Sequence, residues 1–201
     1  MPRAFTEVES SRIRARLAEA GRATFAQRGL RGTTVDDLAR AAGISKGAFY
    51  RFFDSKESLL LALLDEDELA AHTEIEEAVL AEPDRAVDVL ISSALDAVRS
   101  NPLVSLLMSA EGLRLLDSRT PAEQAALLER DARLVDRVLA SLAEAGITLA
   151  VPRPALLGLL RSLAFVGLHR ADIGEEQVDE MARWLTACLR GALQPAPMET
   201  S

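Results

Sequence analysis

A short segment near the N-terminus concentrates side chains that can bind phosphate groups and the edges of DNA bases. Lys46, Tyr50 and Arg51 lie among aromatic residues in the run KGAFYRFF. Ammonium, guanidinium and phenol groups donate hydrogen bonds to phosphate oxygens and to base edges. Gly47 lacks a side chain, so DNA can approach the main chain closely there. The segment therefore predicts a short helix that binds DNA.

Two preceding helices are predicted to hold this segment in position. Small and apolar residues recur at helical spacing between residues 7 and 28, and Gly29 is suited to end that helix. A glycine inside a helix costs about 1 kcal/mol relative to alanine, so we expect another helix to pack closely on Gly21. The second helix is predicted to begin at Thr34, with Asp37 as its capping-box partner.

The turn after the second helix has the residues that a helix-turn-helix requires. Gly43 can adopt the positive φ that ends a helix sharply, Ile44 fills the corner and Ser45 can cap the next helix. Two short helices joined by such a turn can place the second one in the DNA major groove. The charge distribution also favours DNA binding, because residues 1–56 carry eleven basic and six acidic side chains. Residues 57–201 carry twelve and twenty-five, so we expect a polyanion to bind only the N-terminal part.

These residues resemble the DNA-binding segment of the TetR family of bacterial transcriptional regulators. The resemblance covers residues from about 10 to 62 and does not extend to the rest of the chain. The matching positions are Phe25, Gly29, Thr33-Thr34-Val35, Leu38-Ala39, Ala42 to Gly47, Phe49-Tyr50, Phe53, Ser55-Lys56-Glu57 and Leu59. Gly21, Arg22 and Thr24 are smaller or more polar than the residues usual on the family's first helix.

Carried over by position, the resemblance implies two kinds of DNA contact. Phosphate ligands would be Thr34, Tyr50 and Lys56, and base-edge ligands would be Lys46, Gly47 and Ala48, with Arg51 and Asp36 as weaker candidates. Because Arg51 and Phe52 lie where the family varies, no base preference is carried over.

The remaining chain predicts an all-α fold. Helices are expected at about 55–81, 83–100, 102–118, 121–145, 152–169 and 175–193. The run 147–151 looks briefly strand-like, but we interpret it as a loop because it lies between helical patterns. The predicted domains are a three-helix helix-turn-helix DNA-binding domain at 1–56, a helical regulatory domain at 57–193 and a disordered tail at 194–201.

The last two predicted helices are apolar on more than one face, in particular around Leu156, Leu160 and Phe165. Such a helix can be buried within a monomer or can pair with a second copy of the chain. The TetR resemblance favours the second alternative and implies a homodimer through residues of about 152–193.

A small-molecule site is expected in the regulatory domain, because its apolar helices can enclose a cavity with a few polar groups. Its candidate residues are Leu107, Met108, Glu111, Arg114, Phe165, His169 and Trp184. Glu111 could equally pair with Arg114 one helical turn away. The alternative for each of these residues is an ordinary position in the core or on the surface.

No catalytic, metal or cofactor site is predicted. His72, His169 and Cys188 lack metal-ligand spacing, so we expect a surface histidine, a helix-capping histidine and a free thiol. No apolar run reaches the ~18 residues of a membrane span, and no signal core precedes the first helix, so a cytoplasmic protein is expected.

The resemblance implies a transcriptional regulator of double-stranded DNA. We interpret it as a repressor that a small apolar or amphipathic effector releases from a palindromic operator. The alternatives are an activator, or a regulator without a small-molecule inducer. An enzyme or a helical adaptor with an incidental helix-turn-helix is the remaining possibility.

Overall fold

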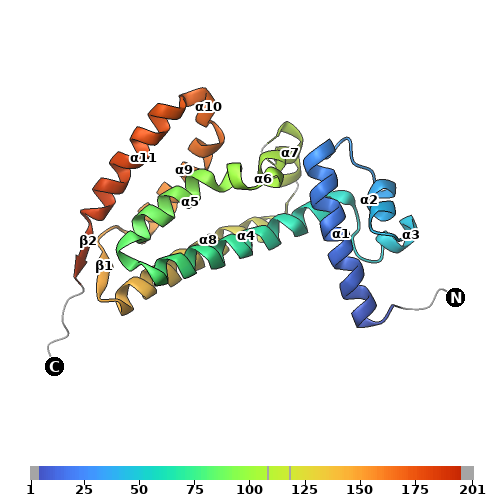
Figure 1. Ribbon diagram of the computed structural model, residues 1–201, viewed down its shortest axis with the longest axis horizontal. Coiled ribbons are helices and arrows are strands. Elements are labelled where there is room, and N and C mark those ends of the chain that lie inside the picture. The colour runs from blue at the N-terminus through green and yellow to red at the C-terminus, as the bar shows by residue number, and fades with distance from the viewer. Residues whose placement is uncertain (1–4, 108, 118, 196–201) are drawn as a thin grey trace. The chain divides into compact units, whose positions relative to one another are not determined.

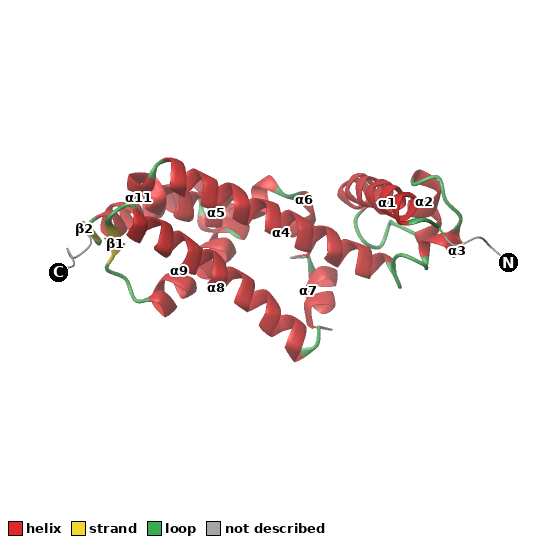
Figure 2. Cartoon of the chain, turned by 90° about the horizontal axis from the view of Figure 1, so that it is seen from below, coloured by secondary structure: helices red, strands yellow, loops and turns green. Residues whose placement is uncertain are grey.

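The computed structural model describes residues 5–107, 109–117 and 119–195, with only the backbone at 98, 100, 111, 116 and 127. Helices account for most of this part of the chain, and two short strands lie near its C-terminal end (Figure 2). The predicted all-α fold is confirmed. The chain divides into two compact units, Met1–Glu68 with Pro102–Ser118 and Leu69–Asn101 with Arg119–Ser201.

The first unit contains the predicted helix-turn-helix (Figure 1). Its helices are α1 (Glu7–Arg28), α2 (Val35–Ala41), α3 (Lys46–Phe49), the first half of α4 (Lys56–Ala81), α6 (Pro102–Leu107) and α7 (Ala110–Asp117). One apolar core joins them, in which Leu17, Leu38 and Phe49 are completely buried. Burial of large apolar side chains from three consecutive helices fixes α3 relative to α1 and α2.

The predicted caps and turns of these helices are confirmed. Thr34 and Asp37 form the capping box of α2, and Gly29 and Gly43 both have φ of +67°. The Ser45 hydroxyl accepts a hydrogen bond of 3.1 Å from the Ala48 amide and so caps α3. A sharp, glycine-dependent turn therefore orients α3.

Gly21 is needed because α4 packs directly against α1. A Cβ atom at Gly21 would lie 2.8 Å from Leu63 Cδ1 and 3.2 Å from Leu59 Cδ2. The prediction of a close helix at this position is confirmed. The small residue lets α4 begin against the centre of α1, where two leucines fill the space that a side chain would occupy.

The single helix predicted from 102 to 118 is wrong, since α6 and α7 replace it. The Gly112 amide donates a hydrogen bond of 3.2 Å to Ser109 Oγ, and this bond caps the N-terminus of α7. A Cβ at Gly112 would lie only 2.1 Å from the Leu107 carbonyl oxygen. Apolar periodicity continues through both helices, so it did not reveal the break.

The second unit is built around α5 (Ala86–Ser100), α8 (Pro121–Glu144), α9 (Arg153–Leu168) and α11 (Glu175–Arg190), with the second half of α4. The short helices η1 (Pro83–Arg85) and α10 (Arg170–Ile173) precede α5 and α11. A Cβ at Gly167 would lie 2.1 Å from the Leu95 carbonyl oxygen, so α9 touches the backbone of α5. Leu163 of α9 and Val178 of α11 are buried with α5 residues in the core that these three helices share.

The interpretation of 147–151 as a loop is wrong for its first part. Strand β1 (Ile147–Leu149) pairs antiparallel with β2 (Leu193–Pro195), with Thr148 opposite Gln194. Gln194 and Pro195 therefore belong to a strand, although we predicted the tail to begin at 194. Residues 196–201 of that tail lie outside the described residues. Within the described ranges, no helix is long and apolar enough to span a bilayer.

Candidate nucleic-acid interface

The predicted DNA ligands on α3 and in the turn after it point away from the core. Lys46, Gly47, Tyr50 and Arg51 are exposed, while Phe49 between them is completely buried. The Phe49 and Tyr50 rings meet edge to face with centroids 5.6 Å apart, so the buried ring supports the exposed one. Among described residues, none lies within 4 Å of a Cβ built at Gly47. This short helix and the turn after it therefore present hydrogen-bond donors and an open stretch of backbone to solvent.

The hydroxyl of Thr34, a predicted phosphate ligand, is already hydrogen-bonded. It donates to Asp37 Oδ2 at 2.7 Å, and the Thr34 amide donates to the same oxygen at 3.3 Å. The hydroxyl bond holds the pKa of Asp37 below its usual value, so this carboxylate stays charged at the start of α2. A DNA phosphate at Thr34 would have to compete with Asp37 for these donors.

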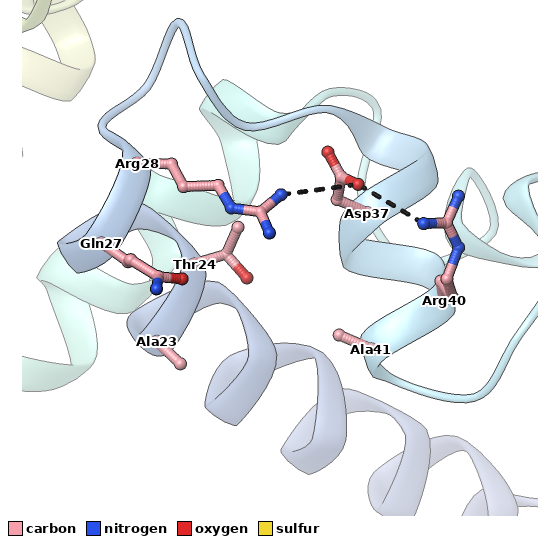
Figure 3. A pocket seen from close by; sticks show the side chains of 7 residues that line it. All are labelled: Ala23, Thr24, Gln27, Arg28, Asp37, Arg40 and Ala41. Carbon is pink, nitrogen blue, oxygen red and sulfur yellow. Dashed lines mark ion pairs between the residues drawn. The ribbon is translucent and has the colours of Figure 1, made fainter.

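Asp37 also borders a hollow of about 260 Å³ between α1 and α2 (Figure 3). Arg28 of α1 and Arg40 of α2 approach Asp37 from two sides, at 3.7 and 3.8 Å (Figure 3). Both guanidinium groups are more than half exposed, so each pair contributes little stability. The hollow therefore holds two solvent-accessible cations beside the capping carboxylate.

Lys46 forms an ion pair with Asp36, which the sequence did not indicate. Its Nζ atom lies 2.7 Å from Asp36 Oδ2, and both side chains are 53% exposed. The hydrogen bond to the carboxylate raises the pKa of Lys46, so the ammonium form is retained. Because the partners belong to α2 and α3, no local sequence spacing could have revealed the pair.

Arg51 is held against the segment that precedes α1. Its Cζ atom lies 4.5 Å from the ring centroid of Phe5, and that ring lies 5.8 Å from Phe52. Phe5 also packs on the core, and Thr6 caps α1. The Thr6-x-x-Glu9 capping box is the signal in the sequence that marks this helix start.

Lys56 faces the loop between α1 and α2. Its Nζ atom donates to the carbonyl oxygens of Leu30 at 2.6 Å and Thr33 at 2.9 Å. The side chain is only 22% exposed. The lysine thus joins the first turn of α4 to the loop that leads into α2, in addition to the phosphate contact predicted for it.

The sequence and the fold both match known regulators. Residues 17–63 match the model for the bacterial regulatory proteins of the tetR family. A crystal structure of a TetR-family transcriptional regulator from Pectobacterium atrosepticum is 25% identical and superposes with a TM-score of 0.66. The match covers 95% of this chain and 100% of that one. Residues 17–63 therefore match a TetR-type DNA-binding domain, and the fold of the chain is similar to that of a TetR-family regulator.

Two curated relatives each match only part of the chain. The transcriptional regulator TtgR of Pseudomonas putida is 39% identical over 79 residues, which cover 37% of this chain and 38% of TtgR. The transcriptional repressor KstR2 of Rhodococcus jostii is 51% identical over 51 residues, a quarter of each chain. The regulator FadR from Bacillus subtilis, solved with stearoyl-CoA, is 16% identical with a TM-score of 0.60 and covers 92% of this chain and 100% of FadR. That last likeness concerns the fold alone.

The residues predicted to line a small-molecule site are distributed over both units of the chain. Leu107 is half-buried against the core of the first unit, and Arg114 is exposed there. Phe165, His169 and Trp184 are exposed in the second unit. Met108 and the side chain of Glu111 lie outside the described residues.

A separate groove of about 700 Å³ lies between α5 and α11 in the second unit. Ile91 and Leu95 of α5 contribute buried apolar side chains to its lining. Arg170 also lines it and donates to Asp179 at 2.8 Å and Glu175 at 3.1 Å. The groove thus combines apolar surface with charged groups, which suits an amphipathic molecule.

The histidines and the cysteine occupy three different environments. His72, expected at the surface, is only 12% exposed and lies 3.9 Å from Asp131 of α8, because α4 packs along α8. Burial lowers the pKa of His72. His169 ends α9 and lies 3.2 Å from Asp172, which confirms the predicted capping position, and Cys188 is an exposed free thiol.

Large apolar side chains are exposed on the last two long helices. Phe165 of α9 is 59% exposed and Trp184 of α11 is 66% exposed. Gly158 and Ser162 are also exposed on the face of α9 that carries Phe165. Exposed aromatic side chains of this kind are enriched at protein–protein interfaces.

Proposed function

We propose that this chain is a DNA-binding transcriptional regulator that represses transcription. The observation that carries the proposal is the exposure of Lys46 and Gly47 on α3, and of Tyr50 and Arg51 directly after it, next to a fully buried Phe49. A helix presented in this way can enter the major groove, where lysine and arginine bind base edges. Thr34, Ala48 and Lys56 complete the proposed DNA-binding set. Residues 1–56 would be the DNA-binding domain and 57–193 the regulatory domain, in a cytoplasmic, non-enzymatic protein.

The proposed active form is a homodimer through residues of about 152–193. Exposed Phe165 and Trp184 support this assignment, because burying such side chains against a second copy removes apolar surface from water. Two α3 helices about 34–36 Å apart would then enter successive major grooves of a palindromic operator. Pairing also lengthens the DNA sequence that one short helix could read.

A small apolar or amphipathic effector is proposed to release the repressor from DNA. FadR, which is similar in fold, was solved with stearoyl-CoA, and this supports a small-molecule effector. Its candidate residues remain Leu107, Met108, Glu111, Phe165 and His169, and the groove between α5 and α11 is a second candidate location. The effector must bind the DNA-incompatible state more tightly, so DNA must weaken effector binding by the same factor.

Transcription in vitro tests the sign of regulation. The template is a genomic fragment that the purified chain enriches, with its natural promoter and bacterial RNA polymerase. We expect added protein to lower transcript yield, and an effector found by thermal-shift screening to restore it. A rise in yield would instead support the alternative proposal, an activator.

A further inference from the structure

The Lys46–Asp36 ion pair lies on the surface that we propose to contact DNA. Lys46 is the first residue of α3, and Asp36 lies in the first turn of α2. The 2.7 Å separation of Nζ and Oδ2 is a direct hydrogen bond, and half of each side chain is exposed to solvent. A molecule that binds Lys46 therefore also meets a carboxylate.

Phosphates and base edges differ in how they can meet such a pair. Phosphate oxygens only accept hydrogen bonds, so they can bind the ammonium group but are repelled by the carboxylate. Each base pair presents acceptors beside an exocyclic amino group in the major groove. A base pair can therefore bind the ammonium group and donate to the carboxylate at the same time.

Non-specific affinity depends on the number of cations that neutralise phosphates. A lysine that keeps its carboxylate partner adds almost no net charge at the DNA surface. An exposed ion pair contributes only about 0–1 kcal/mol, so a base edge can still displace or join it. The pair thus penalises phosphate binding more than base-edge binding.

We propose, on the basis of the proposed DNA-binding function, that Asp36 is a specificity-determining residue that withholds Lys46 from the phosphates of random DNA. Lys46 then contacts DNA mainly where a base edge can also satisfy the Asp36 carboxylate. Asp36 weakens binding to random sequence and thereby raises the ratio of specific to non-specific affinity.

The test compares wild type with Asp36→Asn on a random-sequence 30-bp duplex and on a genomic fragment enriched by the wild type. For the variant we expect random-duplex affinity to rise about three- to tenfold. For this variant, the slope of log affinity against log salt concentration should become steeper by about one for each bound protomer. Affinity for the enriched fragment should rise less, so the specificity ratio falls. Circular dichroism checks that the variant keeps the wild-type fold.

Two further variants make the outcome decisive. Glu19→Gln removes the same charge from an exposed position on α1 and should change random-duplex affinity less than twofold. In a Lys46→Ala background, Asp36→Asn should no longer change the salt dependence. If Asp36→Asn behaves like Glu19→Gln, or acts equally without Lys46, the inference is wrong. If wild type does not prefer any genomic fragment to the random duplex, the proposed function itself fails.

Discussion

The ammonium group of Lys56 lies 2.6 Å from the carbonyl oxygen of Leu30, across the loop that separates α1 from α2. A second hydrogen bond, to Thr33, directly precedes the N-terminal cap of α2. The start of α4 is therefore connected to the start of the helix-turn-helix by one side chain. An ammonium group has three N–H donors, so one remains for a phosphate.

Substitution of Lys56 by methionine separates these two roles of the side chain. Methionine keeps an unbranched apolar stem but leaves two part-buried carbonyl oxygens without their charged donor. We expect the free energy of unfolding to fall by about 1–3 kcal/mol in urea titrations. The salt dependence of DNA binding should also fall by about one per protomer, equally on all sequences. Unchanged stability would contradict the connecting role, and altered sequence preference would contradict the phosphate role.

Gly47→Ala tests whether DNA approaches the backbone of α3. The new methyl group meets open space in the described structure, and alanine favours helix by up to about 1 kcal/mol. We therefore expect thermal stability to be kept or raised, while affinity for an enriched operator falls at least tenfold by fluorescence anisotropy. Full DNA affinity in a stable variant would show that Gly47 is not in the interface.

Gly167→Ala probes the contact between α9 and α5. A Cβ would lie 2.1 Å from the Leu95 carbonyl oxygen, so the helices must separate. We expect a loss of about 1–3 kcal/mol in the free energy of unfolding. Gly158→Ala is the matched control on α9, where a Cβ has no described neighbour within 4 Å, and it should cost nothing. Equal stability of the two variants would contradict the described packing.

Trp184→Ala tests the proposed dimer surface, because this exposed side chain is the sole tryptophan of the sequence. We expect the dimer dissociation constant in sedimentation velocity to rise at least tenfold, since tryptophans often dominate interface energy. Leu69→Ala is the control, because Leu69 is 65% exposed on α4. A monomeric wild type, or equal effects of both variants, would contradict dimerisation through α11.

The histidine on α4 predicts a pH effect on stability. Burial lowers the pKa of His72 from its usual 6.5, so the unfolded chain binds a proton more readily than the folded chain. The stability contributed by neutral His72 is therefore present above about pH 6.5 and lost as the pH falls below it. Urea titrations between pH 8 and 5 should show a shallower decline for His72→Gln. An identical decline in both proteins would assign the effect to other groups.

Local sequence chemistry was sufficient to predict the helix-turn-helix. Gly43 and Ser45 determine where α2 ends and α3 begins through interactions within a few residues. Gly21 in the middle of α1 indicated that another helix packs closely there. The strand pair could not be found in this way, because Ile147 pairs with Pro195 across two long helices. A proline-containing tail gave no strand pattern of its own.

The candidate site was predictable in its composition but not in its interactions. Lys46 and Arg51 were predicted as DNA ligands from their residue types, and both are exposed. Their partners Asp36 and Phe5 come from other elements, and no periodicity relates residues that meet only after folding. The hydrogen bond from Lys56 to the Leu30 carbonyl likewise depends on how α4 packs against the loop between α1 and α2.

Selection of genomic DNA fragments by the purified full-length chain, at about physiological salt and against excess random duplex, tests the central proposal most directly. The account predicts a small set of enriched fragments that share a palindrome. Its half-sites should lie about one helical turn apart, or a multiple of it, and one dimer should bind each palindrome. Recovery of no fragment above the random competitor would contradict sequence-specific regulation by α3.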